Sequence, residues 1–129
     1  MTGKRDKMAI FGDDYATNDG TCVRDYIHIE DLAAAHVSAL RYLEKGGKSD
    51  VFNCGYGDGF SVKQVLDEVQ QLAEKPLAIE QQGRRVGDPD KLVAGNTKIL
   101  NTLDWQPKYQ DLKLICETAL NWEKSYNAK

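Results

Sequence analysis

Apolar residues recur every three or four positions in two long stretches of the chain, a spacing that places them on one side of an α-helix. The first stretch begins after residue 29, ends at Gly46-Gly47, and carries Leu32, Ala35, Ala39, Leu40 and Leu43 at these positions. The second follows Ser61, ends before Pro76, and carries Val62, Val65, Leu66, Val69 and Leu72. The sequence therefore predicts two amphipathic helices.

Helix-capping residues mark where the second of these helices starts and predict two more near the C-terminus. Ser61 can accept a hydrogen bond from the amide of Gln64, whose side chain can return one, which makes a capping box. Asn96 can cap a short helix and Asp111 a final one. The apolar positions of these last two helices are Ile99, Leu100, Leu103, Leu112, Ile115, Ala119, Leu120 and Trp122.

Short apolar runs between the helices predict strands. They are residues 8–12, 22–29, 50–54 and 77–81, of which the third, Asp50–Cys54, is a compact DVFNC run. Residues 83–89 form a loop rich in glycine and arginine. Helices alternating with a few short strands indicate a helix-rich α/β fold.

Composition restricts the possible classes of function. The chain has 129 residues, enough for one domain (1–129), and 41% of them are apolar. Its net charge of −3 does not favour a nucleic-acid partner. The sequence has no apolar run near the ~18 residues that span a bilayer, and a polar start at Met1–Lys7, so we expect a cytoplasmic protein without a membrane partner.

The side chains that most often bind metals are scattered along the sequence. The three cysteines, Cys22, Cys54 and Cys116, form no CxxC pair, and we expect them to be reduced and to serve in packing. His28 and His36 have no third ligand nearby in the sequence. We therefore expect no metal site.

Two segments contain arginines that could bind phosphate: the one around Arg24 and the loop around Arg85. A guanidinium group presents a planar fork of donors to phosphate oxygens and stays charged at any cellular pH. Glycines on both sides of the second segment let a ligand approach the backbone. Alternatively, these arginines are solvated and paired with Asp25 and Asp88. The spacing alone leaves both interpretations open.

A family resemblance favours the first interpretation. The stretch IFGDDYATNDGTCVRDYIHIEDLAAAH, from Ile10 to His36, resembles the UDP-glucose 4-epimerase family, and so do the later segments VFNCGYGDGFSVKQV, RRVGDPDKLVA and LDWQPKY, in the same order. The family belongs to the short-chain dehydrogenase/reductase superfamily of the extended type. The resemblance implies that the chain is the C-terminal substrate-binding portion of that fold, with no complete Rossmann domain.

The resemblance implies a role in UDP-sugar binding for eight residues. Arg24 and Arg85 would clamp the diphosphate, and Asp88 would accept a hydrogen bond from the ribose. The residues lining the uridine site would be Ala9, Phe11 and Tyr26, with Val62 packed nearby.

Leu92 stands where the family places a residue against the hexose, often a bulkier aromatic one. A smaller side chain at this position enlarges the pocket. The resemblance therefore also allows an N-acetylated hexose as the substrate.

In the family, a bound NAD takes hydride from C4 of the sugar while a tyrosine takes the hydroxyl proton. The chain has a glycine cluster at 55, 57 and 59. A GxGxxG motif that starts at Gly55 would need a glycine at position 60, and that residue is Phe60. Tyr109 and Lys113 have the Tyr-x-x-x-Lys spacing, but Asp111 lies between them as a predicted helix cap. We expect both features to be structural, and this chain alone to bind no NAD.

Three functions follow from the sequence. The chain is the substrate half of an epimerase that is inactive by itself, or a stand-alone module that binds UDP or a UDP-sugar. The third possibility is an assembly protein, because in the family the strand at Asp50–Cys54 joins the edge of the large sheet. Without that sheet, the strand could pair two copies into a homodimer.

Overall fold

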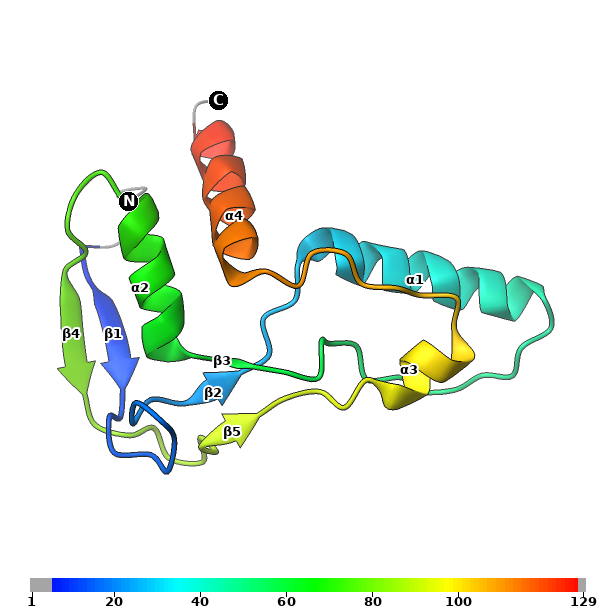
Figure 1. Cartoon of the computed structure of the whole chain (residues 1–129), viewed down its shortest axis with the longest axis horizontal. Coiled ribbons are helices and arrows are strands. Elements are labelled where there is room, and N and C mark those ends of the chain that lie inside the picture. The colour runs from blue at the N-terminus through cyan, green and yellow to red at the C-terminus, as the bar shows by residue number, and fades with distance from the viewer. Residues whose placement is uncertain (1–5, 128–129) are drawn as a thin grey trace.

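A computed structural model describes residues 6–127, so the predicted domain of 1–129 extends beyond the described residues at both ends. Helices and short strands follow one another along the chain (Figure 1). The elements are β1 (Met8–Phe11), β2 (Val23–Arg24), α1 (Ile29–Glu44), β3 (Phe60–Ser61), α2 (Val62–Leu72), β4 (Ile79–Gln82), β5 (Lys91–Leu92), α3 (Thr97–Thr102) and α4 (Leu112–Asn127). The predicted helix-rich α/β class is confirmed.

Two small sheets hold the strands. β1 pairs in parallel with β4, and β2 lies between β3, which is antiparallel to it, and β5, which is parallel. Arg24 is thereby set opposite Phe60 on one side and Leu92 on the other. α2 packs against α4 near β1 and β4, whereas α1 and α3 lie toward the other end of the molecule (Figure 1).

The capping signals were read correctly at two of three helix starts. Ser61 Oγ accepts from the amide of Gln64 at 3.1 Å, and the Gln64 side chain accepts from the Ser61 amide at 2.8 Å. Asp111 accepts from the amide of Leu114 at 2.7 Å. Asn96 precedes α3 but makes no side-chain cap bond, and its amide group donates to the carbonyl of Gly55 at 3.2 Å.

The predicted strand at Asp50–Cys54 is wrong, because these residues are neither helix nor strand. A strand needs a neighbouring backbone to pair with, and none of the described strands pairs with this segment. Val51 is 80% exposed as a result. The run predicted at 22–29 holds only β2 for the same reason, since only Val23 and Arg24 have strand partners.

Several of the predicted apolar helix positions are exposed in the structure. Leu40 and Leu43 of α1 lie in solvent, while the polar residues Asp31 and Ser38 of the same helix are buried. Trp122, expected in the core, is 61% exposed. The helical period identified the helices correctly, but the part of each surface that the chain itself covers depends on distant segments.

The core forms where α3 and the segment after it cover α1. It consists of Ala35, Ile99, Leu103 and Trp105, with Phe52 and Tyr42 packed at its edge. Trp105 is 2% exposed, as expected for a core residue, and its indole N–H donates to the carbonyl of Asp31 at 2.9 Å.

The absence of a side chain at Gly20 is required by the turn that leads into β2. Gly20 has φ +79°, and a Cβ there would overlap the carbonyl oxygen of Asp13. Gly46 has a similar φ of +84° but open space around it. We expect Gly20→Ala to lower the free energy of unfolding by about 3 kcal/mol and Gly46→Ala by about 1 kcal/mol. Equal losses for the two variants in urea unfolding would contradict the steric argument.

Cys22, Cys54 and Cys116 are free thiols. Within residues 6–127, no cluster of histidine, cysteine or acidic side chains has the arrangement that a metal ion needs. None of the described helices combines the length and the apolar character that crossing a bilayer requires.

Candidate nucleotide-sugar site

Arg24 lies on β2, the central strand of the three-stranded sheet, and its side chain is 24% exposed. Its Nη1 donates to the neighbouring carbonyl of Val23 at 2.8 Å, and its Nη2 lies 3.6 Å from Asp88 Oδ1. Because Asp88 belongs to the loop after β4, this ion pair brings that loop to β2. The pair uses only part of the guanidinium fork, so donors remain for a ligand.

Arg85 lies in the same loop, and the structure brings it close to another predicted site residue. Its guanidinium carbon sits 3.7 Å from the centre of the Phe11 ring, at cation–π distance. The carbonyl of Arg85 accepts from the amide of Asp88 at 3.3 Å, which closes the turn. A Cβ added at Gly83 or Gly87 would meet nothing within 4 Å, so the loop is open to a ligand on both sides of Arg85.

The residues predicted at or near the uridine site come from β1, from the segment after β2 and from the start of α2. Ala9 and Phe11 lie two residues apart on β1 and therefore share a face of the strand. Tyr26 follows β2, and burial raises the pKa of its hydroxyl, so the side chain is neutral at cellular pH. Val62 opens α2, and its amide donates to the carbonyl of Cys22 at 3.0 Å, which attaches the helix start to the end of the turn before β2.

A pocket of about 380 Å³ opens beside Arg24 and Leu92. Its wall is completed by Asp25, Asn53, Val93 and Ala94. Leu92 is 62% exposed, so it borders the pocket without closing it. Arg24, which is predicted to bind the diphosphate, and Leu92, which is predicted to contact the hexose, therefore line the same pocket.

Asp25 and Asn53 also line this pocket, and the sequence predicted no ligand-binding role for either of them. The position of Asp25 directly after Arg24 was a usable signal. Asn53 fell inside the predicted strand at 50–54 and was therefore not considered. The alternative pairing of the arginines is realised for Arg24 with Asp88, whereas Asp25 is bonded to the amide of Ala94 at 3.0 Å.

A third arginine, Arg84, is held by the protein itself. Its Nε donates to Asp14 Oδ1 at 2.6 Å, and its guanidinium carbon lies 4.2 Å from the centre of the Tyr15 ring. The bond from Arg84 lowers the pKa of the Asp14 carboxyl below its ordinary value. Among the described residues Arg84 has an acidic and an aromatic partner, whereas the contact given for the Arg85 side chain is with Phe11, so Arg84 is a useful control.

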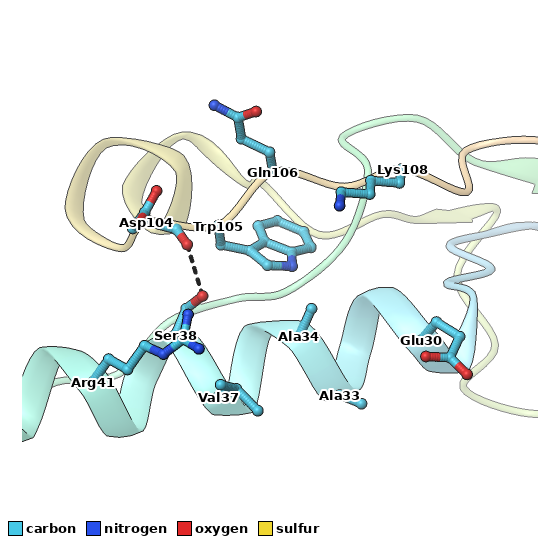
Figure 2. A pocket seen from close by; sticks show the side chains of 10 residues that line it. All are labelled: Glu30, Ala33, Ala34, Val37, Ser38, Arg41, Asp104, Trp105, Gln106 and Lys108. Carbon is cyan, nitrogen blue, oxygen red and sulfur yellow. Dashed lines mark hydrogen bonds between the residues drawn. The ribbon is translucent and has the colours of Figure 1, made fainter.

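Another pocket runs along α1 (Figure 2). It encloses about 560 Å³ between α1 and residues 104–108, with Trp105 between the two walls. Ser38 Oγ donates to the carbonyl of Asp104 at 2.7 Å and so joins α1 to the opposite wall (Figure 2). None of the eight predicted site residues lines this pocket.

Comparison with known proteins finds a family model and several relatives that match this chain. The model of the NAD dependent epimerase/dehydratase family matches residues 2–55. A UDP-glucose 4-epimerase of Halalkalibacterium halodurans is 48% identical over 96% of this chain and 37% of its own length. The chain is a homologue of the C-terminal part of UDP-glucose 4-epimerases.

Solved structures of UDP-glucose 4-epimerases agree. The UDP-Glc/GlcNAc 4-epimerase of Campylobacter jejuni has a TM-score of 0.87 and 53% identity, over 95% of this chain and 37% of that one. The UDP-glucose 4-epimerase of Bifidobacterium longum, solved with NAD+ and UDP, has a TM-score of 0.82 and 33% identity, over 95% and 36%. The chain thus spans little more than a third of the relatives it matches, and its fold is part of theirs.

The glycine cluster does not fit the diphosphate of NAD, the cofactor bound in the Bifidobacterium relative. A Cβ at Gly55 would strike the carboxylate of Asp25, and one at Gly59 would approach Val93 at 2.6 Å. These glycines make room for protein atoms, whereas a phosphate cradle would leave its glycines open to solvent. The turn also leads into β3 before α2 begins.

Tyr109 and Lys113 do not lie on the same helix, as the catalytic tyrosine and lysine of the superfamily do. Tyr109 lies before the start of α4, as the sequence predicted, and its ring stacks on that of His28 at 4.6 Å. His28 is buried and bonded through Nε2 to Thr118 Oγ1 at 2.9 Å. His36 is exposed on α1, with Nδ1 2.8 Å from the carbonyl of Leu32. Tyr109, His28 and His36 therefore have structural explanations.

Proposed function

We propose that this chain is the UDP-sugar-binding part of an enzyme that interconverts UDP-glucose and UDP-galactose. The observation that carries the proposal is the ion pair between Arg24 and Asp88, which joins β2 to the loop of Arg85. It supports a site in which two arginines from distant segments act on one diphosphate. The identity with UDP-glucose 4-epimerases supports the same substrate.

In this proposal the residues of the chain bind and orient the substrate. Arg24 and Arg85 hold the diphosphate, Asp88 accepts from the ribose, and Phe11 and Tyr26 line the uridine site. The exposed Leu92 borders the hexose without gripping it. Tight binding of the nucleotide and loose binding of the hexose suit a reaction in which the sugar must rotate in the site and present its other face.

Redox chemistry at C4 would belong to a part of the protein outside these residues. Exposed apolar side chains at helical spacing on α1, here called the apolar strip, support this division: Ile29, Val37, Leu40 and Leu43. Such a strip is typical of a surface covered in the complete protein. The proposed second part would bind NAD and cover the strip.

The hexose is proposed to include N-acetylated forms. Leu92 leaves the pocket open, and the Campylobacter relative is a UDP-Glc/GlcNAc 4-epimerase. Pairing of two copies through residues 50–54 is the weaker proposal, because that segment is not a strand. Size-exclusion chromatography that gave only a monomer would eliminate it.

Calorimetry with the 129-residue chain tests the proposal. We expect UDP to bind and uridine without phosphate to bind at least about tenfold more weakly, because the arginines act on the diphosphate. A coupled assay should show no interconversion of UDP-glucose and UDP-galactose by this chain. Equal affinity for UDP and uridine would refute the proposal that the arginines bind the diphosphate. Enzyme-like turnover would refute the proposal that the redox chemistry belongs to another part of the protein.

A further inference from the structure

Asp19 is the acceptor of a hydrogen-bond cluster that contains none of the predicted site residues. Its Oδ1 accepts from the amide of Thr21 at 2.9 Å and from the hydroxyl of the same residue at 2.7 Å, and its Oδ2 accepts from the hydroxyl of Ser61. Thr21 and Ser61 are both buried. Burial opposes the ionisation of Asp19, but the bonds from Ser61 and Thr21 outweigh it, so the pKa of the carboxyl lies below its ordinary value.

The two hydroxyls connect Asp19 to the start of α2. Ser61 Oγ accepts from the amide of Gln64 at 3.1 Å, and Thr21 Oγ1 accepts from the amide of Lys63 at 3.2 Å. Each hydroxyl has one hydrogen, which it donates to Asp19, so its lone pairs remain for the helix amides. A negative charge at this place also suits the positive end of the helix dipole. Asp19 thus fixes the first turn of α2 to the turn that leads into β2.

This connection joins two parts of the proposed nucleotide site. Val62, predicted near the uridine, is the first residue of α2, and its amide donates to the carbonyl of Cys22 at 3.0 Å. Arg24, predicted on the diphosphate, follows two residues after Cys22 and lies opposite Phe60 of β3. The position of Val62 relative to Arg24 therefore depends on how the start of α2 is held against the turn that contains Asp19.

We propose that Asp19 is a positioning residue for binding of the UDP-sugar. Through the two hydroxyls it holds Val62 and Arg24 at the separation that uridine and its diphosphate need. This inference rests on the proposed function, because it places the nucleotide across β2 and the start of α2. Asp19 does not touch the ligand in this proposal. It acts by pre-organising the site, since a site that must be ordered during binding has a lower affinity.

Calorimetry with UDP and two variants of Asp19 tests the inference. Asp19→Ala leaves both hydroxyls without their acceptor, and we expect the affinity for UDP to fall about tenfold. Loss of a negative charge by itself would strengthen the binding of an anion, so a fall has the opposite sign from a long-range effect of charge. Asp19→Asn removes the same charge but keeps an acceptor for Thr21 and offers an NH₂ group to Ser61. It should keep the affinity for UDP within about threefold of the unaltered chain.

The matched control is Asp111→Ala, the same change at another aspartate that caps a helix. Asp111 accepts from the amide of Leu114 at 2.7 Å, and none of the eight predicted site residues lies on α4. We expect Asp111→Ala to lower stability in urea unfolding but to change the affinity for UDP less than about twofold. If Asp111→Ala and Asp19→Ala weaken UDP binding equally, the affinity follows overall stability and the inference is wrong.

Two more measurements keep the test independent of the folding of Asp19→Ala. Thr21→Val removes one of the two hydroxyls with little change of shape, and should weaken UDP binding at least about threefold. Ser61→Ala removes the other hydroxyl. Its effect on UDP affinity should be less than additive with that of Asp19→Ala, because both changes break the same bond. Unchanged affinity in Thr21→Val and Ser61→Ala would overturn the inference.

The outcomes separate this inference from the proposed function. If UDP binds and depends on Arg24, but Asp19→Ala binds UDP within twofold of the unaltered chain, the inference is wrong and the proposed function stands. The inference is equally wrong if Asp19→Asn loses as much affinity as Asp19→Ala, because the hydrogen bonds would then not be the cause. If the chain binds no UDP, the proposed function fails and the inference about Asp19 fails with it.

Discussion

Asp31→Ala is expected to cause the largest loss of stability of any single change considered for this chain. The side chain of Asp31 is 2% exposed and accepts three hydrogen bonds. The donors are the hydroxyl of Tyr56 at 2.7 Å and the amides of Lys108 and Tyr109 at 2.9 Å each. Asp31 therefore holds α1, the turn at Tyr56 and the segment before α4 together.

Alanine would leave all three donors without their acceptor in the protein interior. Each orphaned group costs about 1–3 kcal/mol, so we expect the free energy of unfolding to fall by about 3–5 kcal/mol. That is a large share of the ~5–15 kcal/mol by which a typical domain is stable. Urea unfolding followed by circular dichroism measures the loss.

Two further variants make the Asp31 prediction specific. Asp31→Asn keeps one acceptor oxygen and should lose less stability than Asp31→Ala. Tyr56→Phe removes only the hydroxyl, whose pKa rises to about 12 through burial and the bond to Asp31. A loss below about 1 kcal/mol for Asp31→Ala would show that the buried bonds are replaced by water.

Arg24→Ala is expected to have the largest effect on ligand binding. A charge-assisted bond to phosphate contributes about 1.5–3 kcal/mol, so the affinity for UDP should fall about 10- to 100-fold. Arg24→Lys keeps the charge but not the planar fork. Its affinity for UDP should lie between the affinities of the unaltered chain and of Arg24→Ala. Arg85→Ala should weaken UDP binding to a similar extent, because it removes the other half of the proposed clamp.

Arg84→Ala is the control for both arginines, because it removes the same charge and lies next to Arg85 in the loop after β4. Its guanidinium is already engaged by Asp14 and Tyr15, so we expect the affinity for UDP to change less than about twofold. Calorimetry at two salt concentrations separates a direct contact from a general effect of charge. Equal losses for Arg84→Ala and Arg24→Ala would overturn the assignment of the clamp.

The sequence by itself determined the features that depend on a few consecutive residues. The capping box of Ser61 and Gln64, the cap at Asp111 and the end of α1 near Gly46 all rest on hydrogen bonds or dihedral angles within about four residues. The resemblance carried by the RDY and RRVGDPD segments also predicted the family. Comparison with the relatives confirmed it.

Only the tertiary structure decided which side chains are covered and which ones meet. Burial of Asp31 in place of Leu40 depends on segments more than 70 residues away, such as Lys108 and Tyr109. The segment at 50–54 has strand composition but no strand to pair with among the described residues. The pocket of Asp25, Arg24 and Leu92 likewise forms where distant strands align. Local patterns cannot specify these contacts, because their energy comes from partners that only folding brings together.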